Sequence, residues 1–502
     1  MSFKPPKDTI PIRISPETTF LIEPVDATGN SIDYVRVIEG HFAPKSPPTE
    51  NGYRDVVEAL GKTVFFWIFD DQETSVDEEL WNDLCRKLDL DPNLIPSVRY
   101  EPLERTKPGD PNNDFEDDIV SKLQSKPWTD EEYPKAEHWL RQSEAFFRLI
   151  ETAIRKPNYY FSFAKSSPDN SVYPGSLLLP NIAFPREISR CLSIRTLYRL
   201  GQSQWEAAWN DVLLIFKLAR HVQNHPLLIA QLVGMAIEGV ANARALDILK
   251  HAELDKHHLQ GMIDDLDNLR EPLSTREIVF SERLYGLAEL QWRSVYGPDD
   301  EDLSDEFLVP DHLLKDHRKL QMLLRRLPVD WNVVLNKFND MFDRIPVEES
   351  EMLKGWEAFP ELENERMRSF CYYRFTDIAT RSEDLGKRLL NDTCSAWTAF
   401  WGAFLRNKTT TELTRIAFLL EMERLRNDEY PHQLDDLVHG GLLPGLPIDR
   451  MDRSGSGGYR YRREGDGYLL YSVGMSGEDD GGKPFAPETC ELRPDDICIR
   501  MP

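Results

Sequence analysis

The residues best suited to catalysis lie on one predicted helix, residues 227–249. Gln231, Glu238 and Asn242 follow one another at intervals of seven and four residues, so they fall on a single helical face. On an otherwise apolar helix, such a polar stripe must be either hydrogen-bonded or open to a cleft. In a cleft, Glu238 could act as a general acid, and Glu282 on a later helix could provide a second carboxylate. A hydrolase that uses two carboxylates is therefore one hypothesis for this chain.

Arginine partners offer a structural explanation for the same acidic residue. An acidic side chain that pairs with arginine inside a core has a structural role and needs no catalytic explanation. The helical region contains several arginines that could neutralise Glu238, namely Arg186, Arg190, Arg195, Arg199 and Arg244. The deciding observation is whether Glu238 meets a second carboxylate in a cleft or an arginine in a closed core.

Two histidines have a spacing that can hold a metal. His221 and His225 are four residues apart, which can place two zinc ligands on one face of a helix. The sequence contains no HExxH motif to complete such a site. We therefore expect both histidines at a solvated helix end. The sequence also lacks a Gly-rich phosphate loop, a Gly-x-Ser-x-Gly nucleophile motif and the kinase motifs.

The composition narrows the choice of partners. The chain has 86 Asp and Glu against 60 Lys and Arg, and its net charge of −26 repels nucleic-acid phosphates and anionic membrane surfaces. No run of about 20 apolar residues and no signal peptide is found, so direct membrane insertion is not expected. We expect a cytoplasmic protein, or one that reaches the cell envelope through a partner. Cys490 and Cys498 could form a disulfide in an oxidising compartment.

The elements that would position these side chains divide the chain into four predicted segments. Residues 1–62 are rich in proline, 63–135 combine a helical stretch with a polar linker, 136–409 are almost wholly helical, and 410–502 form a small α+β module. In the third segment, helices separated by short turns predict a mainly α fold, a multi-helix bundle of αα-hairpins. Pro185 is expected in the first turn of one of these helices.

The last segment has a different order of elements. A helix is expected to begin near Thr410 and to end near Arg426. After a Gly- and Pro-rich stretch, residues 459–462 and 468–473 are predicted as strands, because they are rich in tyrosine and aliphatic residues. The turn at 464–467 contains two glycines and would join the strands as an antiparallel hairpin.

This order of elements resembles the C-terminal region of type II secretion major pseudopilins. The residues that carry the resemblance are Tyr430, Pro431, Leu434, Leu437, Pro447, Asp449, Tyr461, Tyr468, Tyr471, Ser472 and Gly474. They cover roughly residues 410 to 485, less than a fifth of the chain. The resemblance implies a helix packed on a small antiparallel sheet. It also implies a calcium site in the loop that follows Ser472 and Gly474.

Two departures from the pseudopilin pattern matter. The pseudopilin leader and the membrane-spanning half of the long helix are not found, so assembly into a pilus through that helix is not expected. The family also has an Asp two residues after the glycine, where this chain has Ser476. The Ser476 hydroxyl, Asp479, Asp480 and loop carbonyls could still bind calcium, which prefers oxygen ligands. The alternative for this loop is a solvated acidic turn.

The whole chain also resembles a group of uncharacterised planctomycete-type bacterial proteins. The residues that carry this second resemblance are Asp33, Tyr34 and Val35, then Arg186, Arg190, Arg220 and His221 in the helical middle, and finally the Asp-Asp-Gly-Gly run at 479–482. The resemblance supports the layout of the chain and implies no chemistry.

Two functions follow from these observations. The first is a non-enzymatic helical scaffold or adaptor that carries a pseudopilin-like module and acts through contact with a protein partner. The second is an α-helical hydrolase with carboxylates around Glu238. The only cofactor that the sequence suggests is calcium, in the loop at 476–480.

Overall fold

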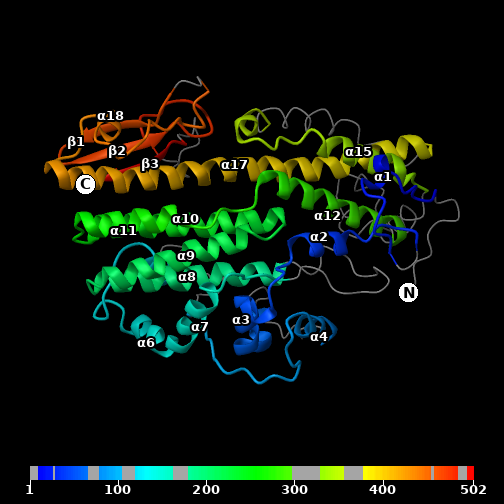
Figure 1. The fold of residues 1–502 in the computed structure, drawn as a ribbon, viewed down its shortest axis with the longest axis horizontal. Coiled ribbons are helices and arrows are strands. Elements are labelled where there is room, and N and C mark those ends of the chain that lie inside the picture. Colours follow the sequence, from blue (N-terminus) through cyan, green and yellow to red (C-terminus); the bar gives the residue numbers. More distant parts are fainter. Residues whose placement is uncertain are drawn as a thin grey trace, which may run out of the picture.

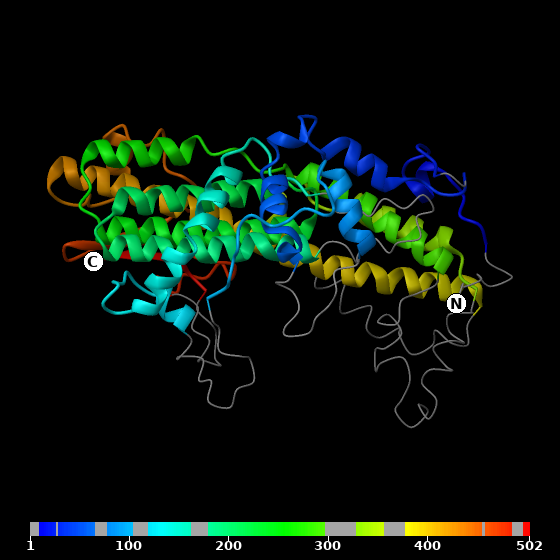
Figure 2. The same ribbon diagram turned by 90° about the horizontal axis from the view of Figure 1, so that it is seen from below.

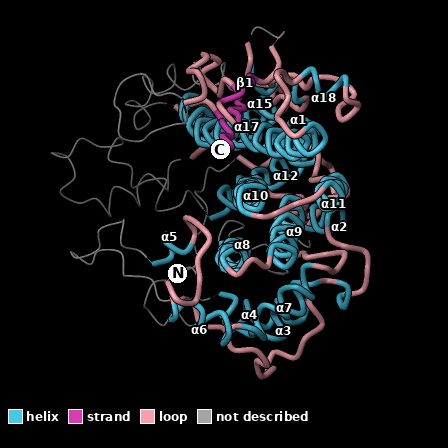
Figure 3. The backbone as a smooth tube through the Cα atoms, turned by 90° about the vertical axis from the view of Figure 1, so that its left-hand side faces the viewer, coloured by secondary structure: helices cyan, strands magenta, loops and turns pink. Residues whose placement is uncertain are grey.

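The computed structural model describes residues 10–26, 29–65, 78–103, 119–161, 179–296, 328–355, 377–453, 457–483 and 495–502. Across these ranges the chain is mainly α-helical, with a small antiparallel sheet near its C-terminal end, so the predicted fold class is confirmed. The long helices lie side by side in layers (Figure 1), which an end-on view separates (Figure 3). Among the helices described, none is both long and apolar enough to span a lipid bilayer.

Three successive helices form the centre of the fold. α8 (Leu179–Gly201), α9 (Trp205–Gln223) and α10 (Leu228–His251) are joined by short turns and pack against one another as αα-hairpins, as predicted. The expectation for Pro185 is wrong, because Pro185 lies inside α8. Proline removes the hydrogen bond to the carbonyl four residues earlier, a loss that α8 tolerates within its first two turns.

The longest helix is α17 (Ile378–Asn427), which has 50 residues and runs along the length of the molecule (Figure 1). The expected helix start near Thr410 is therefore wrong, since residues 410–426 are only the last third of α17. Trp397 and Phe400 are buried in the preceding turns, and Trp397 contacts Phe342 of α15 (Trp331–Phe342). This packing continues the helix upstream of the change in composition at residue 410.

The remaining helices surround this framework. α11 (Lys256–Asp267) packs against α17, while α12 (Thr275–Tyr296) packs against α15. On the N-terminal side, α1 (Pro16–Thr19) lies against α15 and α2 (Tyr34–Phe42) against α12. Further helices in the N-terminal third of the chain are η1 (Pro48–Glu50), α3 (Gly52–Leu60), η2 (Gly61–Phe65), α4 (Glu78–Lys87), α5 (Ile119–Leu123), α6 (Pro134–Gln142) and α7 (Glu144–Ile154).

The C-terminal sheet has three strands in the order β1-β2-β3. β1 (Arg460–Glu464) pairs antiparallel with β2 (Gly467–Ser472), which confirms the predicted hairpin, and β2 pairs antiparallel with β3 (Ile497–Met501). Gly465 has φ +64 in the turn, a conformation that glycine adopts without strain. β2 is buried throughout, between its two neighbours and against α17. The short α18 (Asp435–His439) completes the module.

The third strand was not predicted. In β3, Ile499 and Met501 are buried and Arg500 between them is exposed, and Met501 pairs with Tyr468 across the sheet. Cys498 lies in β3 and is half-buried. Cys490, with which it could form a disulfide, lies outside the described residues.

Candidate functional site

Glu238 lies where three helices meet. It projects from the middle of α10, and its side chain is only 1% exposed. One carboxylate oxygen accepts a hydrogen bond from Arg220 Nη2 of α9 at 2.7 Å and from the Thr411 hydroxyl of α17 at 3.1 Å. The other accepts from Gln223 Nε2 of α9 at 2.7 Å and from Asn407 Nδ2 of α17 at 2.9 Å. The carboxylate is thus paired with an arginine and saturated with donors in a closed core.

The other two residues of the predicted polar stripe, Gln231 and Asn242, also form hydrogen bonds near this junction of helices. Asn242 Nδ2 donates to the Thr411 hydroxyl at 3.0 Å. Gln231 Nε2 donates to the carbonyls of Gln223 and His225, at 2.8 and 2.7 Å, and so holds the turn between α9 and α10. The Glu238 carboxylate and the amide nitrogens of Gln231 and Asn242 are therefore bound within the fold rather than by solvent.

Beside this junction lies a small pocket between α9, α10, α12 and α17. Gln223, Gln231 and Asn407 line its polar part, while Phe400 and Phe404 line its apolar part. Within the described part of the chain, Asn407 Oδ1 and Asn242 Oδ1 are buried atoms without a hydrogen-bond partner. Unsatisfied carbonyl oxygens of this kind are typical sites for a buried water.

Glu282 does not meet Glu238. From α12, its carboxylate accepts a hydrogen bond from the main-chain N–H of Leu228, at the start of α10. Glu238 is ten residues further along α10, or about 15 Å at the helical rise. Burial raises the pKa of Glu282 to about 7, the Leu228 hydrogen bond opposes that rise, and the charge of Glu289 adds to it. The two carboxylates are too far apart to act on one glycosidic bond.

The two histidines point to different main-chain carbonyls. His221 Nε2 lies 2.9 Å from the carbonyl oxygen of Ile154, and His225 Nε2 lies 2.9 Å from that of Phe161. The His225 ring also stacks on the Phe161 ring at a centroid distance of 4.2 Å. The expected solvated helix end is wrong, because the chain at 155–161 covers it and leaves His225 only 1% exposed. Burial lowers the pKa of His225 to about 4.

The three residues predicted to bind calcium fall into different surroundings. The Ser476 hydroxyl accepts the Glu478 N–H at 3.1 Å within the loop. Asp479 accepts the Tyr471 hydroxyl at 3.0 Å, and its other oxygen lies 3.6 Å from Arg460 Nε. The Ser476 N–H also donates to Asp495 Oδ2 at 3.1 Å. Of the three predicted ligands, Asp480 is the one whose carboxylate belongs to a cluster of acids.

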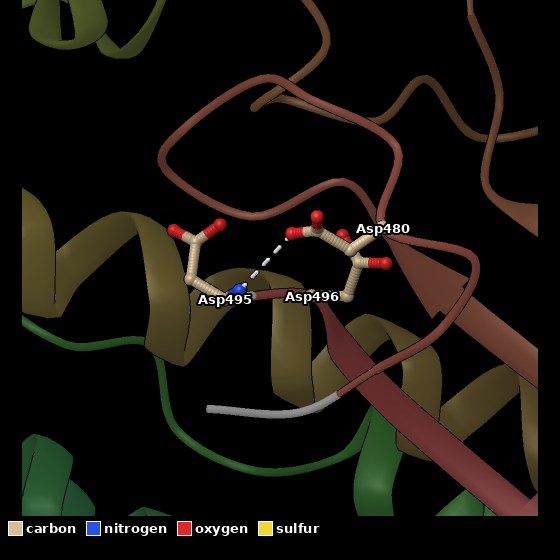
Figure 4. A group of neighbouring side chains, drawn as sticks. All are labelled: Asp480, Asp495 and Asp496. Atoms are coloured by element: carbon tan, nitrogen blue, oxygen red, sulfur yellow. Dashed lines mark hydrogen bonds between the residues drawn. The ribbon is translucent and has the colours of Figure 1, made fainter. Parts of the chain in front are cut away.

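Asp480 forms a cluster with Asp495 and Asp496 (Figure 4), and one ligand oxygen from each lies within 4.8 Å of the others. The Asp495 N–H donates to Asp480 Oδ2 at 3.3 Å, and Asp496 Oδ2 accepts the Gly482 N–H at 2.8 Å. Asp496 is 3% exposed, and its Oδ1 has no hydrogen-bond partner among the described residues. Burial raises the pKa of Asp496, the Gly482 hydrogen bond opposes this, and the charges of Asp480 and Asp479 add to it.

Asp495 and Asp496 were not predicted as ligands from the sequence. They immediately precede β3, so antiparallel pairing with β2 brings them back to the loop that leaves β2. The sequence pattern that could have indicated them is two adjacent acids before a short apolar run. Because β3 was not predicted from that run, there was no reason to place the two acids next to Asp480.

Asp449, one of the residues of the pseudopilin resemblance, forms hydrogen bonds at the end of β2, where the same loop begins. It is 1% exposed, and its carboxylate accepts the Ser472 hydroxyl at 2.8 Å and the Val473 N–H at 3.1 Å. Burial raises its pKa, while hydrogen bonds from Met451, Ser472 and Val473 oppose the rise. Asp449 therefore positions the end of β2.

No protein-family model, curated protein or solved structure matches this chain. Two places in the structure therefore bear on function. One is the junction around Glu238, and the other is the carboxylate cluster around Asp496.

Proposed function

We propose that this protein is a non-enzymatic helical scaffold or adaptor that works through contact with protein partners. The observation that carries this proposal is the closed environment of Glu238. A general acid must reach its substrate, yet Glu238 is 1% exposed and holds Arg220, Gln223, Asn407 and Thr411. A carboxylate used in this way fixes the arrangement of helices.

The distance between the two candidate carboxylates favours the same conclusion over a hydrolase. Glu282 binds the first turn of α10 and Glu238 binds α9 and α17 from its middle. Each carboxylate therefore holds a different pair of neighbouring elements together, and the two do not face a common site.

Isosteric substitution in living cells tests the scaffold proposal. A strain that lacks the protein should be rescued by the Glu282→Gln variant, and by a Glu238→Gln variant that retains the helical circular dichroism spectrum, as well as by wild type. Failure of a variant that is folded and present at the wild-type level would favour the hydrolase. The exposed Glu58→Gln variant is the control for expression and tagging, because its only described ion pair joins it to Arg54 at the surface.

We further propose that the C-terminal module is pseudopilin-like and binds one Ca²⁺ through Asp480, Asp495 and Asp496. Three carboxylates within 4.8 Å repel one another unless a cation or protons compensate the charge. Among the described residues, Asp496 Oδ1 is buried and has no hydrogen-bond partner, and a buried carboxylate oxygen requires one. Oxygen ligands of this kind suit calcium, and loop carbonyls and water would complete its shell.

Calcium titration of the full chain tests this site. After treatment with a chelator, added Ca²⁺ should raise the melting temperature, because a ligand that binds only the folded state stabilises it. The Asp496→Asn variant should lose the response, while Asp479→Asn should keep it, because Asp479 faces Tyr471 and Arg460. An equal response in both variants, or none in wild type, would disprove the site. The affinity also bears on localisation, since dissociation constants of about 10⁻⁴–10⁻³ M are typical of extracellular modules.

A further inference from the structure

The two faces of the C-terminal sheet have different surroundings. The sheet lies at one end of the molecule, beside the C-terminal turns of α17 (Figure 2). Tyr468 and Leu470 of β2 belong to the main hydrophobic core, together with residues of α17. Leu469 and Tyr471 alternate with them along the strand, so they lie on the outer face of the sheet. They are only 0% and 6% exposed, although neither joins a core cluster among the described residues.

The loop that leaves β2 covers this outer face. We call residues 474–483 the covering loop. A Cβ added to Gly482 would lie 2.5 Å from Leu469 Cδ2 and 3.2 Å from Tyr471 Cδ1, so the main chain at Gly482 packs directly on both side chains. The Tyr471 hydroxyl donates to Asp479 Oδ1 of the loop at 3.0 Å. Leu469 and Tyr471 are therefore buried by a surface loop rather than by a helix.

The covering loop is fixed to the residues before β3 by the proposed calcium ligands. Asp496 Oδ2 accepts the Gly482 N–H at 2.8 Å, and Asp495 Oδ2 accepts the Ser476 N–H at 3.1 Å. From the loop, Asp480 Oδ2 accepts the Asp495 N–H at 3.3 Å (Figure 4). One oxygen from each of the three carboxylates lies within 4.8 Å of the others. Their mutual repulsion therefore acts between the loop and the start of β3.

We propose that calcium controls whether the covering loop lies on the outer face of the sheet. With Ca²⁺ bound, Asp480 is held against Asp495 and Asp496, and the loop stays on Leu469 and Tyr471. Without Ca²⁺, the repulsion among the carboxylates displaces the loop and exposes these two side chains. Repulsion at this distance is of the same order as the hydrophobic free energy of covering one leucine and one tyrosine, so a bound cation can decide the balance. This inference rests on the calcium site proposed above.

Displacement of the loop changes the chemistry of this end of the molecule. The loop carries three consecutive acids, at 478–480. Beneath it, Leu469 pairs across the sheet with Arg462 of β1 and Arg500 of β3, and these arginines border the face that Leu469 and Tyr471 form. Calcium would thereby switch one surface between an acidic state and an apolar state bordered by arginines.

Hydroxyl-radical footprinting with mass spectrometry tests this response, because it reports the solvent access of single side chains. Removal of calcium by a chelator and desalting should raise the oxidation of Leu469 and Tyr471 several-fold. Tyr468 and Leu470, on the opposite face of the same strand, are internal controls and should not change. An equal rise at all four residues would indicate unfolding of the sheet and overturn the proposal.

Isothermal titration calorimetry on the same samples distinguishes this inference from the site on which it rests. Calcium binding without a change in the oxidation of Tyr471 would overturn the movement of the loop and leave the calcium site intact. Absence of calcium binding would overturn both.

Two neighbouring glycines distinguish contact with the sheet from backbone strain. Gly481 and Gly482 have φ +74 and +78, but a Cβ at Gly481 would meet nothing within 4 Å. Gly482→Ala should therefore leave Tyr471 open to oxidation even with calcium present, whereas Gly481→Ala should behave as wild type. Equal oxidation in the two variants would contradict the packing of the loop on the sheet.

The Asp480→Asn variant tests repulsion as the cause of the movement. Its side-chain oxygen can still accept the Asp495 N–H, but the charge on the loop side of the cluster is removed. The loop should then stay on the sheet with or without calcium, and the oxidation of Tyr471 should be low in both conditions. Oxidation as high as in calcium-free wild type would overturn repulsion as the cause.

Discussion

Arg220 and Glu238 form an ion pair of 2.7 Å between α9 and α10, and the carboxylate is 1% exposed. Because Asn407 and Thr411 of α17 bind the same carboxylate, a single side chain connects three helices. A buried pair of this kind contributes little net free energy while it is intact, but its loss leaves an uncompensated charge.

Removal of the Glu238 carboxylate should therefore destabilise the fold strongly. We expect Glu238→Ala to lower the free energy of unfolding by about 3–5 kcal/mol, the usual cost of breaking a buried pair. Urea denaturation followed by circular dichroism measures the change. The matched control is Glu58→Ala, which removes an exposed pair with Arg54 and should cost no more than about 1 kcal/mol. Similar losses in the two variants would contradict the central role of Glu238.

Glu282 should make stability depend on pH. The fold raises its pKa from 4.5 to about 7, mainly through burial, so the folded state prefers the protonated form. Its stabilising contribution is complete below pH 4.5 and is lost as the pH rises to about 7. Glu282→Gln still offers an acceptor to the Leu228 N–H but does not titrate. The variant should gain stability relative to wild type as the pH rises from 4.5 to 7, and parallel stability curves would contradict this.

Two glycines of α10 should respond in opposite directions to the same substitution. A Cβ at Gly234 would lie 2.5 Å from Gln223 Cγ, and Gln223 cannot withdraw because it binds Glu238 and Gln231. Gly234→Ala should therefore cost about 1–3 kcal/mol of unfolding free energy, as in other overpacked sites. Gly239 has nothing within 4 Å of such a Cβ, so Gly239→Ala should stabilise the fold by about 1 kcal/mol through helix propensity. Calorimetry or urea denaturation distinguishes the signs.

A substitution at Gly474 should change the conformation of the loop and thereby weaken calcium binding. It has φ +66, and a Cβ there would lie 2.4 Å from the carbonyl oxygen of Asp495. Gly474→Ala should displace Asp495 and Asp496 from Asp480 and weaken the calcium-induced rise in melting temperature. Gly465→Ala has the same backbone strain in the hairpin turn, where a Cβ meets nothing within 4 Å, and should keep the full response. Isothermal titration calorimetry of both variants provides the comparison.

The helical layout could be predicted from sequence because apolar periodicity is a local signal. The start of α17 could not, because residues 378–409 join the later part of the helix through burial of Trp397 and Phe400 against α15, a tertiary effect. β3 was missed for a similar reason. Five residues at the chain end are a weak strand signal, and β2, its pairing partner, lies more than twenty residues away.

The same distinction applies to the candidate sites. Glu238 and its stripe could be predicted from spacing on one helix, but the donors Asn407 and Thr411 lie 169 and 173 residues later in the chain. Among the predicted calcium ligands, Asp480 joins other carboxylates, whereas Asp479 turns to Tyr471. Which acids of a loop converge depends on strand pairing, and a linear sequence carries no direct record of it.

The length of α17 gives the molecule a mechanical property. At 1.5 Å per residue the helix is about 75 Å long. Glu238 forms hydrogen bonds with Asn407 and Thr411 of this helix, about 45 Å from its N-terminal end and about 25 Å from its C-terminal end. Because α10, α15 and the strands β2 and β3 all pack on this one continuous helix, it joins both ends of the molecule as a single stiff rod.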